Sequence, residues 1–430
     1  MQKVAWLLLT YSLCIKMLKT KREKEKTFKT VLLIALCWAV YTCSYLGKLG
    51  YNANIAQIES AYAISHSVAG MVSTCFFFAY GVGQVFSGIF CKKYNIRLVV
   101  FGSLLVSGLM NLLVGISDNF SFIKYFWLIN GAALSVLWPS LIRLLSESFD
   151  TEDIGRAVVA MGTTVAIGTL FVYGFSALFV AFKMYQIMFY LAAALLPFIA
   201  VVWFFSYPKL VTVKVISSEK GGGQVRDETL KMSQMQGLWL AIVVLAFFAI
   251  VDNLIKDGLT TWIPIILKEQ YKLSDFISIL LTMVLPILAI LGTSVAVILH
   301  KKIKDFVMLC AVLFFVSALC ILAVILCMPM GWVVLTIGNL GIVSCLMAGV
   351  NNVITSMAPL YWKEKVNSGM MAGILNGFCY LGSTLSAYGL GLIADMGGWN
   401  LVFWVLFGLC MVTIFLSLLY FAFRFKKNNK

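Results

Sequence analysis

Charged residues are scarce in this chain, because Asp, Glu, Lys and Arg together make up only 12% of its 430 residues. Histidine is rarer still, and His66 and His300 stand too far apart in the sequence to form a metal centre or to activate a nucleophile. The GxxxxGK[ST] loop that cradles nucleotide phosphates is also missing. These absences argue against an enzyme, against a metal or other cofactor, and against ATP as an energy source.

Hydrophobic residues dominate instead, at 61% of the sequence, with a mean hydropathy of +0.96. Such a composition is typical of a multi-pass membrane protein. Apolar runs long enough to cross a bilayer as helices recur about twelve times, whereas a barrel would show short alternating strands. The sequence therefore predicts an all-α membrane protein. The predicted spans are residues 28–50, 68–91, 96–116, 122–146, 157–181, 184–206, 237–264, 276–299, 306–327, 331–357, 368–394 and 399–424.

The formal net charge of +15 is distributed in a way that favours a lipid bilayer over nucleic acid as the partner. The basic residues of one side lie within residues 16–29, 92–97, 209–231, 301–304, 363–365 and 424–430, together with Arg156. The opposite loops hold only Lys124, Lys183, Lys268 and Lys272. By the positive-inside rule, both termini and the middle loop are predicted to be cytoplasmic. We expect a monomer in a plasma membrane, the inner membrane of a bacterium.

A polar stretch at residues 208–236 divides the predicted spans into two groups of six. It contains Gly221, Gly222 and Gly223, both signs of charge and no strong periodicity, which indicates a cytoplasmic linker. The predicted organisation is a basic arm (1–27), a six-helix bundle (28–207), the linker, a second bundle (237–424) and a cytoplasmic tail (425–430). The two bundles are expected to be pseudo-symmetric halves.

Two lysines stand alone inside predicted spans. Lys48 lies in the sequence Tyr45-Leu-Gly-Lys48-Leu-Gly-Tyr51, and Lys256 lies in Asn253-Leu-Ile-Lys256-Asp-Gly258, each in the first span of its half. A cation at bilayer depth costs roughly 2.5–3.5 kcal/mol on insertion scales, so such lysines normally face a cavity and a polar or anionic partner. We expect Lys48 and Lys256 to converge on one central site that holds an anion during transport.

Acidic neighbours of Lys256 leave an alternative open. Asp252 precedes Lys256 by four residues and Asp257 adjoins it, so Lys256 can be neutralised within its own helix when the site is empty. A pair that must open to admit an anion would couple binding to a rearrangement. Asp252 and Asp257 are therefore candidates for a coupling role.

Other polar residues in the spans have two interpretations each. Arg143 and Glu147 lie four residues apart, which fits an ion pair at the membrane edge or a cytoplasmic gate. Tyr80 and Gln84 share a helix face that either lines the site or joins neighbouring helices. Among the polar residues of the tenth and eleventh spans, we expect only Asn351 and Tyr380 to line the site.

Five segments of the chain form a recognisable set. They are Tyr41-x3-Tyr45-Leu-x-Lys48, Ala79-Tyr80-Gly81, Trp138-Pro139-x3-Arg143, Thr261-Trp262-x-Pro264-x2-Leu267-Lys268-Glu269 and Ala372-Gly373-x6-Tyr380-Leu-Gly382. This set resembles the organophosphate:phosphate antiporters of the major facilitator superfamily, which include the bacterial glycerol-3-phosphate and hexose-phosphate transporters. The resemblance covers the chain from about residue 28 to residue 424.

That resemblance implies a rocker-switch cycle in which a basic residue from the first helix of each half grips the substrate phosphate. Lys48 and Lys256 occupy those two positions, although the family usually has arginine there. Lysine binds phosphate as a point charge, without the bidentate fork of arginine, which also admits carboxylate or sulfonate. The tyrosines that match residues lining the family's site are Tyr41, Tyr45, Tyr80 and Tyr380. Glu147 departs from the family, because the glycerol-3-phosphate transporter has a site histidine there.

The sequence therefore predicts a secondary transporter that exchanges an organic phosphate, such as a sugar phosphate or glycerol phosphate, for inorganic phosphate. One alternative is a sugar-phosphate sensor with a transporter fold. Another is a proton-coupled transporter of an organic anion, a sugar or a drug, for which Asp252 and Asp257 are the candidate titrating carboxylates.

Overall fold

The structure, a computed structural model, describes residues 2–90, 94–149, 151–211, 232–362 and 368–428, and the regular elements in these ranges are helices. Eleven helices in these ranges are long and apolar enough to cross a membrane. Helices suit that environment because every backbone N–H and C=O is bonded within the segment itself. The predicted all-α class is therefore confirmed. The predicted eleventh and twelfth spans share one long element, which turns at Gly398 with φ +73°.

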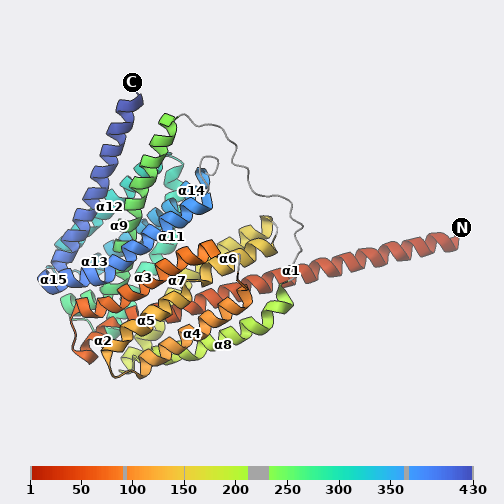
Figure 1. Cartoon of the computed structure of the whole chain (residues 1–430), viewed down its shortest axis with the longest axis horizontal. Coiled ribbons are helices and arrows are strands. Elements are labelled where there is room, and N and C mark those ends of the chain that lie inside the picture. The colour runs from red at the N-terminus through yellow and green to blue at the C-terminus, as the bar shows by residue number, and fades with distance from the viewer. Residues whose placement is uncertain (1, 91–93, 150, 212–231, 363–367, 429–430) are drawn as a thin grey trace.

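The described residues of the first half fold into eight helices. They are α1 (Gln2–Ala53), α2 (Ile55–Tyr62), α3 (His66–Phe90), α4 (Ile96–Ile116), α5 (Phe120–Leu134), α6 (Leu137–Ser148), α7 (Thr151–Ala181) and α8 (Ile187–Leu210). The predicted arm and first span form one continuous helix, whose N-terminal part projects from the bundle (Figure 1). The predicted polar connection after the first span contains α2, because Ile55 and Ile58 are buried there.

The second half contains α9 (Met232–Tyr271), α10 (Asp275–Thr282), α11 (Val284–His300), α12 (Phe306–Cys327), α13 (Val333–Asn352), α14 (Ala358–Tyr361) and α15 (Ser368–Asn428). A π-helical turn, Val353–Met357, joins α13 to α14. Most of the predicted linker, at residues 212–231, lies outside the described residues. The proposed domain boundaries at 207 and 237 therefore stay predictions.

Two predicted spans are interrupted rather than straight. The fourth span divides at Ser135 and Val136 into α5 and α6, three residues before Pro139. The eighth divides at Met283 into α10 and α11, three residues before Pro286. Proline has no N–H to donate and clashes with the preceding turn, so a break just before it is expected. The break before α6 places the Trp138 ring 4.8 Å from the Tyr41 ring, centroid to centroid.

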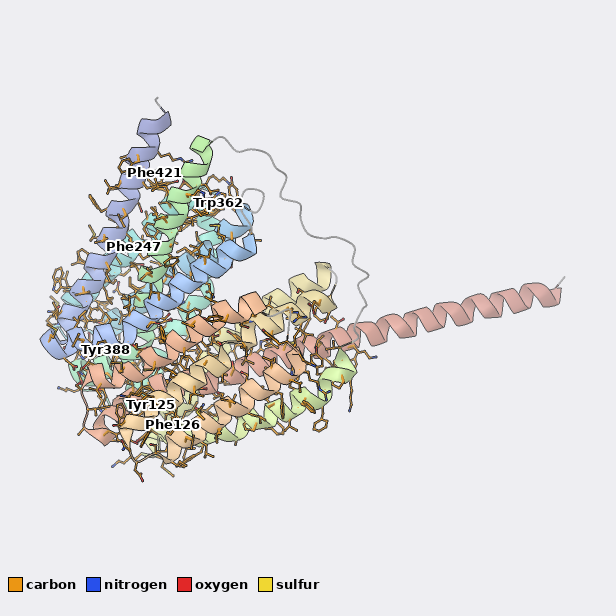
Figure 2. All side chains as sticks on the ribbon, in the orientation of Figure 1. Tyr125, Phe126, Phe247, Trp362, Tyr388 and Phe421 are labelled. Atoms are coloured by element: carbon orange, nitrogen blue, oxygen red, sulfur yellow. The ribbon has the colours of Figure 1, made fainter. Side chains whose placement is uncertain are left out.

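Large apolar side chains cover the outside of the bundle. Phe198, Phe205 and Val334 are 64%, 62% and 83% exposed, and aromatic side chains such as Tyr125 of α5 and Phe421 of α15 mark the two halves in Figure 2. Exposed apolar surface on this scale is unfavourable in water and favourable against lipid chains. The protein is a multi-pass membrane protein.

The two halves meet at one end of the bundle, which we call the closed end. There the Asn52 side-chain amide donates to Thr261 Oγ1 at 2.9 Å, and the Tyr173 hydroxyl donates to the Thr260 carbonyl at 2.6 Å. Tyr388 of α15 lies near this end in Figure 2, where its backbone N–H donates to Thr74 Oγ1 of α3 at 3.1 Å. The halves diverge toward the opposite side, which carries α6 and α14 (Figure 1).

Candidate functional site

Lys48 lies at the centre of a group of tyrosine rings. On α1 the positions of Tyr41, Tyr45 and Lys48 differ by four and three, so the three side chains share one helix face. Lys48 Nζ lies 4.4 Å from the ring centroid of Tyr80, 5.4 Å from that of Tyr45 and 5.9 Å from that of Tyr380. Cation–π attraction acts at such distances. No carboxylate of the described residues forms an ion pair with Lys48, which leaves its charge available to an anion.

The rings around Lys48 come from both halves of the protein. Tyr41 and Tyr45 of α1 pack edge to face at 5.7 Å between ring centroids, and Tyr80 of α3 lies 5.0 Å from Tyr380 of α15. Gly81 makes the second contact possible, because a Cβ there would stand only 2.6 Å from the Tyr380 Cβ. The structure thus brings together Lys48 and all four predicted tyrosines.

Gln84 joins this group to the second half. Its side-chain amide donates to the Tyr80 hydroxyl at 3.1 Å, and its Oε1 accepts from the Asn376 side-chain amide at 2.8 Å. Gln84 thus joins α3 to α15, as one interpretation of this face predicts. Tyr80 faces Lys48, and its role in substrate binding stays a prediction. The sequence predicts no site role for Asn376, and in the structure its side-chain amide joins α15 to α3.

Lys256 is held by an amide rather than by a carboxylate. Its Nζ donates to Asn253 Oδ1 at 2.8 Å. Asp252, which is fully buried, accepts at Oδ2 from the side-chain amides of Asn253 at 3.2 Å and Asn351 at 3.3 Å. Asp252 Oδ1 has no hydrogen-bond partner among the described residues. Asn351, which is predicted to line the site, is thus linked to Lys256 indirectly, by hydrogen bonds that run through Asp252 and Asn253.

Asp257 lies beside the tyrosine group. Its Oδ2 accepts a hydrogen bond from the Ser383 hydroxyl of α15, and the carboxylate lies within electrostatic range of Tyr45 and Tyr380. Lys256 lies within electrostatic range of both Asp252 and Asp257, yet neither forms an ion pair with it in the described part of the chain. Asp252 and Asp257 therefore influence Lys256 electrostatically without forming an ion pair with it. The predicted role of these carboxylates in coupling stays a prediction.

The two lysines approach adjacent residues of α15. Lys48 faces the Tyr380 ring, and Lys256 lies within electrostatic range of Cys379. Lys48 thus faces the tyrosine rings, while Lys256 is held by Asn253. The convergence of the two lysines on one site stays a prediction.

Arg143 and Glu147 form the ion pair that their spacing predicts. Arg143 Nε lies 2.7 Å from Glu147 Oε1, and half of the Glu147 side chain is exposed. Arg143 also donates from Nη1 to the backbone carbonyl of Tyr94 at 3.5 Å. This geometry fits a structural ion pair on α6. A gating role for either residue stays a prediction.

Sequence reasoning missed a polar cluster at the closed end. His66 Nδ1 lies 3.1 Å from both carboxylate oxygens of Glu59, and its Nε2 lies 3.6 Å from Glu269 Oε2. Glu269 also accepts from Trp399 Nε1 at 2.6 Å, and Asp395 accepts from the backbone N–H of His66. Burial raises the pKa of Glu59, and the hydrogen bond from His66 opposes that shift. Glu269 and Asp395 lie too far from His66 in sequence for any spacing motif to reveal them, and Glu59, seven residues before His66, belongs to a different helix.

Together these features define a class: a two-halved helical membrane protein whose halves share a buried, cation-bearing site. The family comparison agrees, because the model of the Major Facilitator Superfamily matches residues 37–368. The chain belongs to the Major Facilitator Superfamily. That membership also confirms the prediction that the protein is not an enzyme.

Several curated relatives match shorter stretches. The membrane sensor protein UhpC of Escherichia coli is 27% identical over 118 residues, which are 27% of this chain and 27% of that protein. A 3-(3-hydroxy-phenyl)propionate transporter of E. coli is 24% identical over 151 residues, covering 35% and 38%. A probable hexose phosphate transport protein of Chlamydia muridarum is 23% identical over 128 residues, covering 30% and 28%. The matched stretches thus span about a quarter to two fifths of these relatives.

A solved structure agrees over nearly the whole chain. A bacterial homologue of the human lysosomal transporter Spinster, in an inward-facing and unoccupied conformation, aligns with a TM-score of 0.67 at 13% identity. The alignment covers 93% of this chain and 97% of that one. This likeness confirms the predicted fold of two six-helix halves.

Proposed function

We propose that this transporter exchanges an organic phosphate for inorganic phosphate by alternating access. The observation that carries the proposal is Lys48, a cation among tyrosine rings from both halves without an ion-pair partner in the described part of the chain. An unpaired charge in a low-dielectric interior is unfavourable, so a bound anion stabilises the closed, water-free states of the cycle. An empty site would cross between states slowly, which favours obligatory exchange. The similarity to a hexose phosphate transport protein supports phosphate as the recognised group.

We also propose the orientation. The basic residues on the side of the termini and linker support a cytoplasmic location for both termini, in the plasma membrane of a bacterium. In that orientation the closed end faces outward, and the described conformation is open toward the cytoplasm.

The test is counterflow in proteoliposomes. Purified protein is reconstituted into vesicles loaded with inorganic phosphate, and uptake of radiolabelled phosphate is followed with and without an external sugar phosphate as competitor. We expect uptake only into phosphate-loaded vesicles, inhibition by the sugar phosphate, and no response to a protonophore. Uptake into phosphate-free vesicles driven by a pH gradient would contradict the exchange proposal.

A sensor is the second candidate, and the similarity to the membrane sensor protein UhpC favours it. A sensor binds its ligand without completing the transport cycle. The same vesicles discriminate between the two, since saturable phosphate binding without counterflow would identify a sensor.

Proton coupling is the third candidate, because Asp252 is a fully buried carboxylate with one oxygen unpartnered among the described residues. In the Asp252→Asn variant, the side-chain oxygen still accepts from Asn351, while the titrating group is gone. If exchange is the mechanism, we expect this variant to keep phosphate counterflow that does not respond to a pH gradient. If the wild-type protein shows proton-driven uptake and the Asp252→Asn variant lacks it, the result would favour proton coupling instead. Uptake is measured with and without an imposed pH gradient.

A further inference from the structure

The charges of the candidate site are unequal between the two halves. The first half contributes Lys48 alone, whereas the second contributes Lys256 with Asp252 and Asp257. Both carboxylates act electrostatically on Lys256, so one lysine and two carboxylates leave the second half with one surplus negative charge. Asp252 is fully buried whereas Asp257 is partly exposed, so Asp257 is the carboxylate that a ligand can reach.

Asp257 is placed to meet a ligand. The Ser383 hydroxyl binds Oδ2, while Oδ1 bonds to no group in the described part of the chain, and the side chain is only partly buried. The carboxylate lies within electrostatic range of Tyr45 and Tyr380. These are two of the three rings around Lys48. Ser383 lies three residues after Tyr380 on α15, so Asp257 is held about one helical turn along α15 from a ring that faces Lys48. A ligand at these rings therefore meets both an ammonium group and a carboxylate.

A simple phosphomonoester fits only half of this arrangement. Its phosphate is attracted to Lys48, but Asp257 repels it across a low-dielectric interior, where charges interact more strongly than in water. A substrate that also carries a protonated amine converts that repulsion into attraction. Such a substrate would also give Asp257 Oδ1 a charge-assisted hydrogen-bond donor.

We propose that the preferred organic substrate is a phosphomonoester that also carries a protonated amine, with its phosphate at Lys48 and its ammonium group at Asp257. This inference rests on the proposed phosphate exchange and narrows its substrate class. A neutral hydroxyl at the same position would donate to Asp257 without the added attraction between opposite charges.

The test uses three probes that differ at one position of the sugar. Glucosamine 6-phosphate, glucose 6-phosphate and N-acetylglucosamine 6-phosphate compete with radiolabelled phosphate in the counterflow assay. The first carries an ammonium group at carbon 2, the second a hydroxyl and the third a neutral amide. We expect glucosamine 6-phosphate to compete ~10- to 100-fold better than the other two, the range for a charge-assisted hydrogen bond.

The matched variants are Asp257→Asn and Asp275→Asn. Asp275 forms an ion pair with Lys268 at 2.9 Å near the closed end and lies outside the site. We expect Asp257→Asn to abolish the preference for the amine, measured as the ratio of inhibition constants, and Asp275→Asn to keep the wild-type ratio. If Asp257→Asn does not fold, the wild-type probe series still decides the question.

Each outcome has a separate meaning. Phosphate counterflow without a preference for glucosamine 6-phosphate would overturn this inference and leave the proposed function intact. Absence of any counterflow would overturn the proposed function itself. An Asp257→Asn variant that weakens all three probes equally would also overturn the inference, because Asp257 would then serve only to position Lys256.

Discussion

Replacement of Lys48 by alanine is expected to abolish phosphate exchange while the protein still folds and inserts. The ammonium group faces three tyrosine rings and no described carboxylate, so its removal leaves an aromatic, neutral site in the first half. A hydrogen bond to a charged group contributes about 1.5–3 kcal/mol, which corresponds to roughly 10- to 100-fold in affinity. Binding of phosphate to the detergent-purified protein, by calorimetry, and counterflow in vesicles measure the two effects.

Two further variants make this result specific. Lys48→Arg keeps the charge and is expected to retain exchange, since the guanidinium group also binds phosphate. Lys268→Ala removes a lysine that pairs with Asp275 near the closed end, and we expect near wild-type exchange because that ion pair is partly exposed. Wild-type counterflow in Lys48→Ala would contradict the assignment of the anion site.

The fold was predictable from sequence because a lipid environment leaves few choices. Apolar runs of sufficient length identify the spans, and the structure places helices at nearly all the predicted positions. What the pattern of hydrophobicity did not reveal is where helices break. Ser135 and Met283 are ordinary residues of apolar runs, and the breaks depend on local backbone geometry before Pro139 and Pro286.

The site was only partly predictable, for a different reason. Lys48 and Lys256 are conspicuous because a charge inside an apolar run is costly, and the tyrosines followed from the family resemblance. The side-chain amides of Asn253 and Asn376 could not be assigned to the site from sequence, because an Asn side chain bonds equally well to a neighbouring helix or to a ligand. The pairing of His66 with Glu269 joins residues far apart in the chain, and one sequence carries no information on such distant contacts. Glu59 is only seven residues from His66, but the turn between α2 and α3 decides whether their side chains meet.

The second large effect is expected when a closely packed glycine at the closed end is replaced by a larger residue. A Cβ at Gly391 of α15 would stand 2.8 Å from the His66 carbonyl oxygen of α3 and 2.8 Å from the Trp262 ring. Gly70 of α3 has the same role, since a Cβ there would lie 2.4 Å from the Ala387 carbonyl oxygen. Backbone atoms cannot yield as a flexible side chain does, so a larger residue must separate the halves. The conformation that this contact stabilises should then lose population.

We therefore expect Gly391→Val to open the closed end and to slow exchange, whereas Gly389→Val should do neither. Gly389 is a matched control, because it lies one residue beyond Tyr388 on the same helix and a Cβ there would meet nothing within 4 Å. Overpacking costs about 1–3 kcal/mol, which corresponds to a shift of roughly 5- to 100-fold between conformations. The reporter is a Ser73→Cys substitution, since Ser73 is 1% exposed and bonds to Asn52, which in turn bonds to Thr261 of the other half. Its labelling by an impermeant maleimide, corrected for the native cysteines, should rise in Gly391→Val alone. Equal labelling in both variants would mean that packing at Gly391 does not hold the closed end together.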